Sequence, residues 1–201
     1  MEFSFSKNKI VLERELSRLD EFVLDFASLL DDAGADYVIV SGYVAIVFGR
    51  SRGTEDVDIL VRRLDKKRFS KFWKLAEKKF ECINAANEQN AYDDYLANDT
   101  AIRFSRKGKF IPNIEFKYAK NELDEYSLEN RVALLLNGKK LFISQLELQI
   151  AYKLFLGSEK DVEDARFLYK LFQDKLDLQS INSLAGQLNV KKKLRLLGLE
   201  K

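Results

Sequence analysis

The sequence predicts an α/β (α+β) protein in which a mixed sheet is flanked by helices and followed by a C-terminal helical half. Two observations predict this fold class. As far as residue 143, short apolar runs of strand length alternate with amphipathic stretches at helical spacing, and from residue 144 the pattern is helical. We therefore expect an α/β domain in residues 1–137 and a helical domain in residues 138–201, with a soft boundary.

Side-chain periodicity defines the elements of the first domain. One apolar stripe predicts a helix over residues 11–33, and Gly34 suits its C-terminus. Phe69, Phe72 and Trp73 lie at helical spacing within residues 64–80, so this helix should cover one face of the sheet. The other expected elements are a strand at 36–40, a short helix at 44–48, a strand at 56–61, a short strand and variable loop at 81–100, and strands at 101–105 and 111–118.

Turn and cap signals define the second domain. Residues 134–143 predict a hairpin around Asn137-Gly138, which we expect to connect the two halves. Ser144 and Glu147 have the spacing of a capping box, and Gly157 suits the end of the helix that they begin. The remaining expected features are a helix capped by Ser158 and Asp161, a helix at 178–188, and a basic tail at 191–201.

Composition excludes several classes of site and of location. Histidine is absent, which excludes Ser-His-Asp and Cys-His catalysis and histidine-ligated zinc. Cys82 is the single cysteine, so the chain cannot form an internal disulfide. The first residues lack an apolar signal core, and apolar runs stay well below membrane-spanning length. We expect a cytoplasmic protein that does not enter a membrane.

Asp56 and Asp58 are the strongest indication of chemistry. They lie one residue apart in an otherwise apolar strand, so both carboxylates project from the same face of the sheet. Two like charges held this close repel each other, and a divalent cation would neutralise them. Because carboxylates must supply the ligands, Mg²⁺ or Mn²⁺ is the expected cofactor.

A phosphate seat is expected beside these aspartates. The strand at 36–40 ends in Ser41-Gly42, and a short apolar helix follows. Free backbone N–H groups and the helix dipole at such a turn favour an anion.

These motifs together resemble the nucleotidyltransferase superfamily, which has the polymerase-β-like fold. Within it, the branch of AbiEii-like toxins and antibiotic nucleotidyltransferases has the same R-x-T-x-D-x-D pattern. Ser41 stands where that branch usually has a glycine. The residues that carry the resemblance are Ser41, Gly42, Arg52, Thr54, Asp56 and Asp58.

The resemblance also implies roles for residues outside this motif. It requires a third catalytic and metal-binding carboxylate, for which Glu115 on the strand at 111–118 is the candidate; the alternative is a surface glutamate. Lys153 would meet the triphosphate, and Asp161 or Asp164 would orient the nucleotide or the acceptor. The alternatives are a lysine that reaches water, a helix-capping Asp161 and a solvated Asp164.

The implied activity is metal-dependent transfer of a nucleoside monophosphate from an NTP to an acceptor hydroxyl. Because the branch includes toxins, tRNA or another RNA is the leading acceptor, and a cognate antitoxin protein is an implied partner. Basic side chains in residues 62–79, among them Lys71, Lys74 and Lys78, and in residues 191–195 can neutralise RNA phosphates, or they are simply solvated.

Two other functions stay open. One is transfer to a small antibiotic-like acceptor, for which an acidic loop would attract a cationic drug. The other is a non-catalytic member of the fold that binds nucleotide or a partner protein. The carboxylates of the candidate loop are Glu88, Asp93, Asp94 and Asp99.

Overall fold

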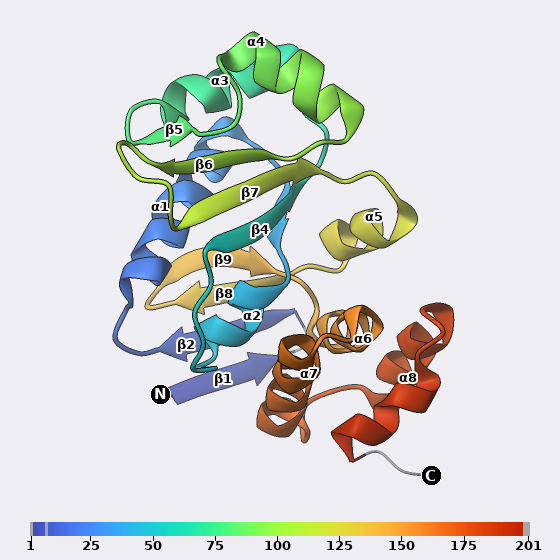
Figure 1. The fold of residues 1–201 in the computed structure, drawn as a ribbon. Coiled ribbons are helices and arrows are strands. Elements are labelled where there is room, and N and C mark those ends of the chain that lie inside the picture. The colour runs from blue at the N-terminus through green and yellow to red at the C-terminus, as the bar shows by residue number, and fades with distance from the viewer. Residues whose placement is uncertain (1, 7, 199–201) are drawn as a thin grey trace.

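The computed structural model describes residues 2–6 and 8–198, and in this part of the chain nine strands form one mixed sheet with helices on both faces (Figure 1). This confirms the expected fold class. The strand order is β1-β2-β8-β9-β3-β4-β7-β6-β5. The strands are β1 (Glu2–Ser6), β2 (Lys9–Glu13), β3 (Tyr37–Ile39), β4 (Asp56–Val61), β5 (Phe80–Cys82), β6 (Ile102–Arg106), β7 (Asn113–Tyr118), β8 (Val132–Leu136) and β9 (Lys139–Ile143).

The helices divide between the two faces of the sheet. Phe26 and Phe72, from the first and third helices, pack on Phe104 of β6 on one face. On the other face Leu128, from the fifth helix, packs with Leu60 of β4. The helices are α1 (Arg18–Ala33), α2 (Gly42–Val47), α3 (Lys66–Ala76), α4 (Glu88–Asn90), α5 (Glu122–Glu129), α6 (Leu146–Leu156), α7 (Glu159–Phe172) and α8 (Leu178–Gln187).

The start of the first helix differs from the expectation. Ile10 and Leu12 are buried in β2, which pairs in parallel with β8, so residues 11–13 belong to the sheet. Their apolar side chains fit both a helical stripe and an alternating strand, and sheet pairing decides between the two. The helix begins at Arg18 because Ser17 and Asp20 form a capping box. Gly34 (φ 71°) ends it as expected.

Residues 64–130 contain three further differences. The helix expected at 64–80 ends at Ala76, and Phe80 lies in β5. The variable loop at 81–100 contains α4, a π-helical turn over Ala91–Tyr95 and a 3₁₀ turn over Leu96–Asn98. The sequence analysis missed α5, whose polar sequence ELDEYSLE has weak helical periodicity.

The hairpin around Asn137-Gly138 belongs to the sheet itself. Both turn residues have positive φ (49° and 76°), as a type I′ turn requires. β8 pairs with β2, and β9 pairs with β3, so the change from sheet to helices comes after Ile143. The boundary expected near residue 137 therefore coincides with the turn of this hairpin.

The capping box expected at Ser144 is wrong. α6 begins at Leu146 with Gln145 as its N-cap, and the Glu147 carboxylate accepts a hydrogen bond from the backbone N–H of Asp177 (3.0 Å). Glu147 therefore joins α6 to the start of α8. The ends expected at Gly157 and Ser158 are confirmed, since Gly157 (φ 72°) ends α6 and the Ser158 hydroxyl caps α7. In the basic tail, Lys191–Leu197 is a 3₁₀ helix, and residues 199–201 lie outside the described part.

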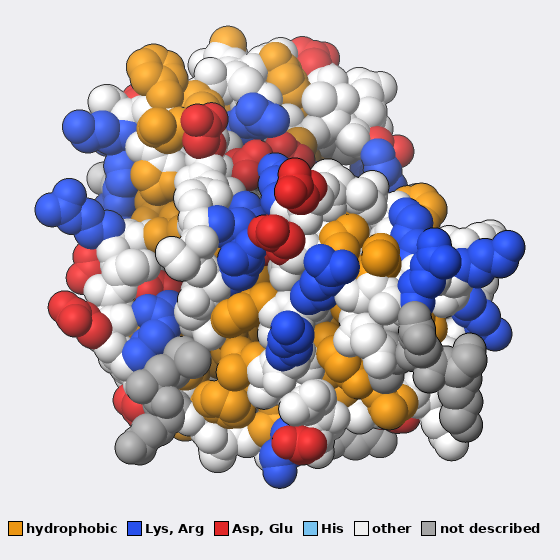
Figure 2. Space-filling model, turned by 60° about the horizontal axis from the view of Figure 1, so that its bottom comes forward, with side chains coloured by type: hydrophobic (Ala, Val, Ile, Leu, Met, Phe, Trp, Pro, Cys, Tyr) orange, Lys and Arg blue, Asp and Glu red, His pale blue; other side chains and the backbone are white. Residues whose placement is uncertain are grey.

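The surface mixes charged and apolar side chains. Figure 2 shows one face on which Lys and Arg side chains lie among hydrophobic ones. Among the helices that the structure describes, none combines the length and the hydropathy that spanning a bilayer requires.

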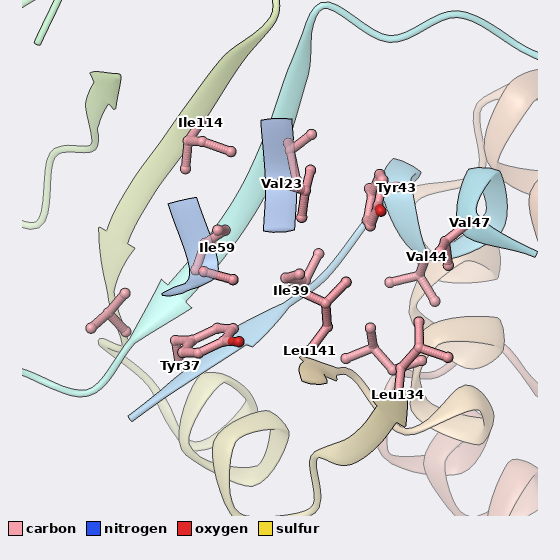
Figure 3. Close-up of a cluster of buried hydrophobic side chains, with 14 of the residues drawn as sticks. Val23, Tyr37, Ile39, Tyr43, Val44, Val47, Ile59, Ile114, Leu134 and Leu141 are labelled. Atoms are coloured by element: carbon pink, nitrogen blue, oxygen red, sulfur yellow. The ribbon is translucent and has the colours of Figure 1, made fainter. Parts of the chain in front are cut away.

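Part of the largest core cluster lies between α1, α2 and the centre of the sheet. Ile39, Ile59 and Ile114 project from β3, β4 and β7 into it, and Val23 of α1 and Tyr43 of α2 close it (Figure 3). All five side chains are fully buried. The core therefore fixes the position of α2 relative to the central strands, which is the region of the predicted motifs.

Ser17→Ala should destabilise the protein by about 1 kcal/mol, because the first turn of α1 loses its N-cap acceptor. Urea unfolding of both variants would measure the effect. Ser28→Ala, at an exposed position within α1, is the matched control and should change the unfolding free energy by less than about 0.5 kcal/mol. Equal midpoints for wild type and Ser17→Ala would contradict the capping box.

Candidate active site

The pairing of β4 with β7 positions the central carboxylates. The two strands run parallel, with Asp58 opposite Glu115 and Val57 opposite Ile114. Val57 and Ile114 are buried in the core, so Asp58 and Glu115 project from the other face of the sheet. The structure thus places Glu115 beside the aspartates and on their face, as the sequence analysis expected.

Lys117 lies between the two carboxylates. Its ammonium is 2.9 Å from Asp58 Oδ1 and 3.3 Å from Glu115 Oε1, and Glu115 also accepts a hydrogen bond from Arg103 (2.9 Å). Burial lowers the pKa of Lys117, but the charges and hydrogen bonds of Asp58 and Glu115 outweigh it and raise the pKa above its usual value. The lysine therefore stays protonated, and together with Arg103 it offsets the two negative charges of this pair.

The donor set suits a hard divalent cation chemically, because Asp56, Asp58 and Glu115 supply carboxylate oxygens on one face of the sheet. Within the described residues, however, no group of three or more Asp, Glu, Cys or His side chains is arranged to hold a metal ion. Asp56 instead accepts a hydrogen bond from the Thr54 hydroxyl (3.3 Å to Oδ1), and Lys117 holds the other two carboxylates. A metal would have to displace the Lys117 ammonium.

The Ser41-Gly42 turn lies next to this group. Val40, just before it, donates its backbone N–H to Asp58 O (3.0 Å). Ser41 has φ 64° and ψ −133°, a strained backbone for a residue with a side chain. The Gln149 side chain holds this backbone: it donates to Ser41 O (2.7 Å) and accepts from Ser41 N–H (3.3 Å). Gln149 was missed by sequence analysis, since it lies 108 positions away.

Gly42 lies directly beneath the Arg52 side chain. A Cβ at this position would clash with the Arg52 guanidinium, so the guanidinium covers the turn and would have to move for any other residue. The structure thus brings together Ser41, Gly42 and Arg52, three of the residues that carry the resemblance in the sequence.

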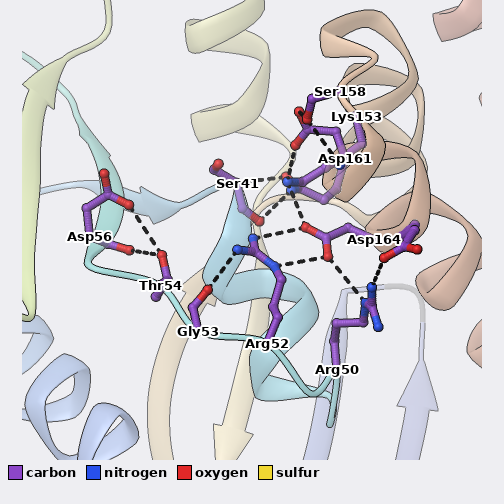
Figure 4. Close-up of polar contacts among 12 residues, drawn as sticks. Ser41, Arg50, Arg52, Gly53, Thr54, Asp56, Lys153, Ser158, Asp161 and Asp164 are labelled. Carbon is purple, nitrogen blue, oxygen red and sulfur yellow. Dashed lines mark hydrogen bonds and ion pairs between the residues drawn. The ribbon is translucent and has the colours of Figure 1, made fainter.

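A buried ionic cluster joins this turn to the helical half (Figure 4). Asp164 is fully buried and accepts two hydrogen bonds from Arg52 (3.1 Å from Nε and 3.0 Å from Nη2). Lys153 is 1% exposed and lies 2.9 Å from Asp164 and 2.7 Å from Asp161. Arg50 also contacts Asp164 (3.6 Å). We call Arg50, Arg52, Lys153, Asp161 and Asp164 the ionic cluster.

The positions of Lys153, Asp161 and Asp164 distinguish between the alternatives given for them from the sequence. Lys153 does not reach water and Asp164 is not solvated, so both simple surface interpretations are wrong. Asp161 has three structural contacts: its backbone N–H donates to Ser158 Oγ (3.3 Å), and its carboxylate accepts a hydrogen bond from the Ser158 hydroxyl and pairs with Lys153. Burial raises the pKa of Asp161, but the hydrogen bonds from Lys153 and Ser158 outweigh it, so the pKa is lowered.

A pocket of about 260 Å³ opens beside Asp58, between the sheet, α5 and α6. Its polar groups include Asp58, Lys117 and the Ser41-Gln149 pair. Most of its wall is apolar. The apolar lining residues are Val40, Leu60, Leu123, Leu148, Tyr152 and Leu156. The pocket therefore places an apolar surface directly against Asp58.

Two of the three charged surfaces named from the sequence, the lysines of α3 and the acidic loop, lie away from this pocket. Phe72 of α3 stacks on Phe116 (5.2 Å), which follows Glu115 in β7, so α3 and its lysines cover the opposite face of the sheet. In the acidic loop, Asp93 pairs with Lys66 and Asp99 pairs with Arg63. Local basic side chains thus neutralise much of the charge that would attract a cationic acceptor.

The sequence matches no family model and no curated protein. Solved structures do match over nearly the whole chain. An antigenic nucleotidyltransferase-like protein from Paracoccidioides brasiliensis has 18% identity and a TM-score of 0.53, over 89% of this chain and 91% of that one. This chain has the nucleotidyltransferase fold.

The antibiotic-resistance factor ANT(2'')-Ia is similar to this nucleotidyltransferase fold in two structures. Its solution structure has 10% identity and a TM-score of 0.54, over 89% of this chain and 96% of that one. Its crystal structure in complex with adenylyl-2''-tobramycin has 12% identity and a TM-score of 0.53, over 88% and 99%. At these identities the likeness concerns the fold, and the activity has to be argued from the site.

Lys153→Met should lower the free energy of unfolding by roughly 3 kcal/mol, because it leaves the buried Asp161 and Asp164 without their shared ammonium. Urea unfolding at pH 7 would measure this loss. Lys170→Met, at an exposed position in α7, is the control and should shift stability by less than about 0.5 kcal/mol.

The contribution of the Lys153–Asp161 pair to stability should also depend on pH. Because the pKa of Asp161 is lowered in the folded protein, its contribution is present above the unfolded pKa near 4 and is lost as the pH falls through the folded value. The difference in stability between wild type and Lys153→Met should therefore shrink on acidification below about pH 4. A difference that stays constant down to pH 2 would contradict the pairing.

Proposed function

We propose that the protein is a metal-dependent nucleotidyltransferase that moves a nucleoside monophosphate from an NTP to an acceptor hydroxyl. The observation that carries the proposal is the pairing of Asp58 with Glu115 on one face of the sheet, together with a pocket that Asp58 and Ser41 both line. Asp56 extends the same face of β4. This arrangement combines carboxylates for metal binding with a site for phosphates and a space for a substrate.

In the proposed reaction the acceptor oxygen forms a bond to the α-phosphorus of the NTP. The bond from that phosphorus to the bridging oxygen breaks, and pyrophosphate leaves with the electron pair. Asp56, Asp58 and Glu115 would hold Mg²⁺ or Mn²⁺, which would lower the pKa of the acceptor hydroxyl and neutralise phosphate charge. Glu115 would also take the hydroxyl proton.

The phosphates are proposed to lie against the Ser41-Gly42 turn. Arg52 covers this turn and keeps a planar, permanently charged group there, and Thr54 orients Asp56 through its hydroxyl. Lys153 would add positive charge behind Arg52. In this proposal Asp161 and Asp164 orient the two basic side chains until the triphosphate replaces part of their contacts.

The proposed acceptor is RNA, and tRNA is the acceptor that the resemblance to AbiEii-like toxins supports. In that role a cognate antitoxin protein would be a partner and the cytoplasm the site of action. The exposed basic residues Lys191, Lys192 and Arg195 are consistent with an RNA acceptor.

A small-molecule acceptor is the second candidate. The likeness to ANT(2'')-Ia, solved with adenylyl-2''-tobramycin, favours it. Incubation with each labelled NTP, Mg²⁺, and either total tRNA or aminoglycosides would separate the two acceptors and test the activity itself. Absence of label transfer to every acceptor would favour the third possibility, a non-catalytic protein that binds nucleotide or a partner.

Asp58→Asn should reduce transfer by about a thousandfold or more, because an amide does not neutralise the metal and several kcal/mol of transition-state stabilisation is lost. Circular dichroism should show an unchanged fold, since Asp58 projects away from the core. Asp94→Asn is the control: Asp94 is exposed in the acidic loop and should leave transfer unchanged. Loss of transfer in the control would point instead to the loop as an acceptor site.

Lys117→Met should make the protein more dependent on divalent metal. Without the ammonium, Asp58 and Glu115 repel each other, and Mg²⁺ binding would relieve this repulsion. The rise in melting temperature on adding Mg²⁺ should therefore be larger in Lys117→Met than in wild type. Lys120→Met, at an exposed position just beyond β7, should behave like wild type. Equal shifts in all three proteins would argue against a metal at these carboxylates.

A further inference from the structure

The outward face of α6 carries an aromatic pair at the edge of the pocket. Tyr152 and Phe155 are stacked, with ring centroids 5.8 Å apart and an interplanar angle of 26°. Phe155 is 49% exposed, and the neighbouring Leu156 is 46% exposed. An exposed aromatic side chain of this size has an unfavourable contact with water unless a ligand covers it.

This pair is continuous with the proposed active site. Tyr152 and Leu156 line the same pocket as Asp58 and Lys117, and Leu148, one turn earlier in α6, lines its inner part. A ligand that lies on Phe155 can therefore extend along Tyr152 into the pocket and reach the carboxylate face of the sheet.

Positive charge lies at the same end of α6. Lys193 donates to the backbone oxygen of Leu154 (2.8 Å), and its ammonium lies 2.7 Å from the position that a Cβ at Gly157 would take. This contact brings the segment 191–195, which has four basic residues and no acidic one, next to the exposed end of α6. Within it Lys191, Lys192 and Arg195 are exposed.

We infer that Tyr152 and Phe155 form a stacking platform for an unpaired nucleobase of a single-stranded RNA acceptor, whose phosphates contact the basic segment 191–195. The inference rests on the proposed function, because it names the chemical class of the acceptor and its route to Asp58. Flat aromatic surfaces beside lysine and arginine are the combination by which proteins bind single-stranded nucleic acid.

The charge distribution favours RNA over the other occupants. A cationic small molecule would be repelled by segment 191–195, and the acidic loop that could attract it carries its own basic partners. A protein partner could cover Phe155 and Leu156, but it would not need a planar ring at position 155. That difference makes the two occupants experimentally distinguishable.

The test measures binding of a fluorescein-labelled, unstructured ten-nucleotide RNA to the full chain by fluorescence anisotropy, across a salt series. Phe155→Ala should weaken binding by about 5- to 150-fold, the range expected for loss of one stacked base. Phe155→Trp should retain the affinity because it keeps a flat ring, and Phe155→Leu should not. The matched control is Phe110→Ala, at a 76% exposed phenylalanine in the β6–β7 connection, which should leave the affinity unchanged.

Stabilisation by NTP and Mg²⁺ against heat, measured on the same preparations, separates this inference from the proposed function. Suppose that NTP binds as to wild type. If the RNA affinity of Phe155→Ala then equals that of wild type, or if Phe155→Leu has the wild-type RNA affinity, the platform is overturned. The exposed side chains would in that case be an apolar face for a protein partner. Failure of the wild-type protein to bind the RNA also overturns the platform. If no NTP binds while RNA affinity still depends on the ring at position 155, the platform stands and the proposed transferase activity fails.

Discussion

The register of β4 against β7 is the constraint on which the rest of the molecule depends. Alternate residues of these strands fill the core with Val57, Ile59 and Ile114 and expose Asp58 and Glu115 on the other side. A shift of one residue would bury the carboxylates and expose the apolar side chains. The same strand register therefore determines both the burial of the core and the position of the acids. The same rule puts Lys117 on the acidic face, two residues after Glu115, where it and Arg103 offset the two negative charges without any contribution from a ligand.

The ionic cluster links this sheet to the helical half. Removing Lys153 and Asp164 from water is costly, and several direct contacts with opposite charges offset the cost. An apolar contact could join the same elements with less desolvation, so the use of charge here requires another explanation. Arg52 provides one, because its guanidinium also lies against Gly42. The contact that fixes α7 to the sheet thereby holds a permanent positive charge over the turn where the phosphates are proposed to lie.

Local signals in the sequence predicted much of the fold and the position of the candidate site. Alternating apolar residues around Asp56 and Asp58 predicted β4, and the cap signal at Ser158 predicted the start of α7. Sequence alone failed where two periods coincide, as in residues 11–13, and where long-range contacts decide. Gln149 acts on Ser41 from 108 positions away, and Asp164 meets Arg52 from 112 positions away. No local sequence feature of either residue in these pairs indicates its distant partner. Burial of Lys153, which pairs with the same Asp164, could therefore not be predicted.

The distribution of charge around the pocket also limits how an acceptor can lie in it. The inner end has Asp58, which repels phosphate, and the outer end of α6 adjoins the basic segment 191–195. A bound polyanion therefore has its most favourable free energy when its phosphates stay at the outer end and an uncharged part contacts the apolar wall of the pocket. A terminal nucleoside, with its uncharged base and its hydroxyl groups, is such a part. In the proposed reaction the hydroxyl would then approach the carboxylates while the backbone stays near lysine and arginine, which is the orientation that transfer to an acceptor hydroxyl requires.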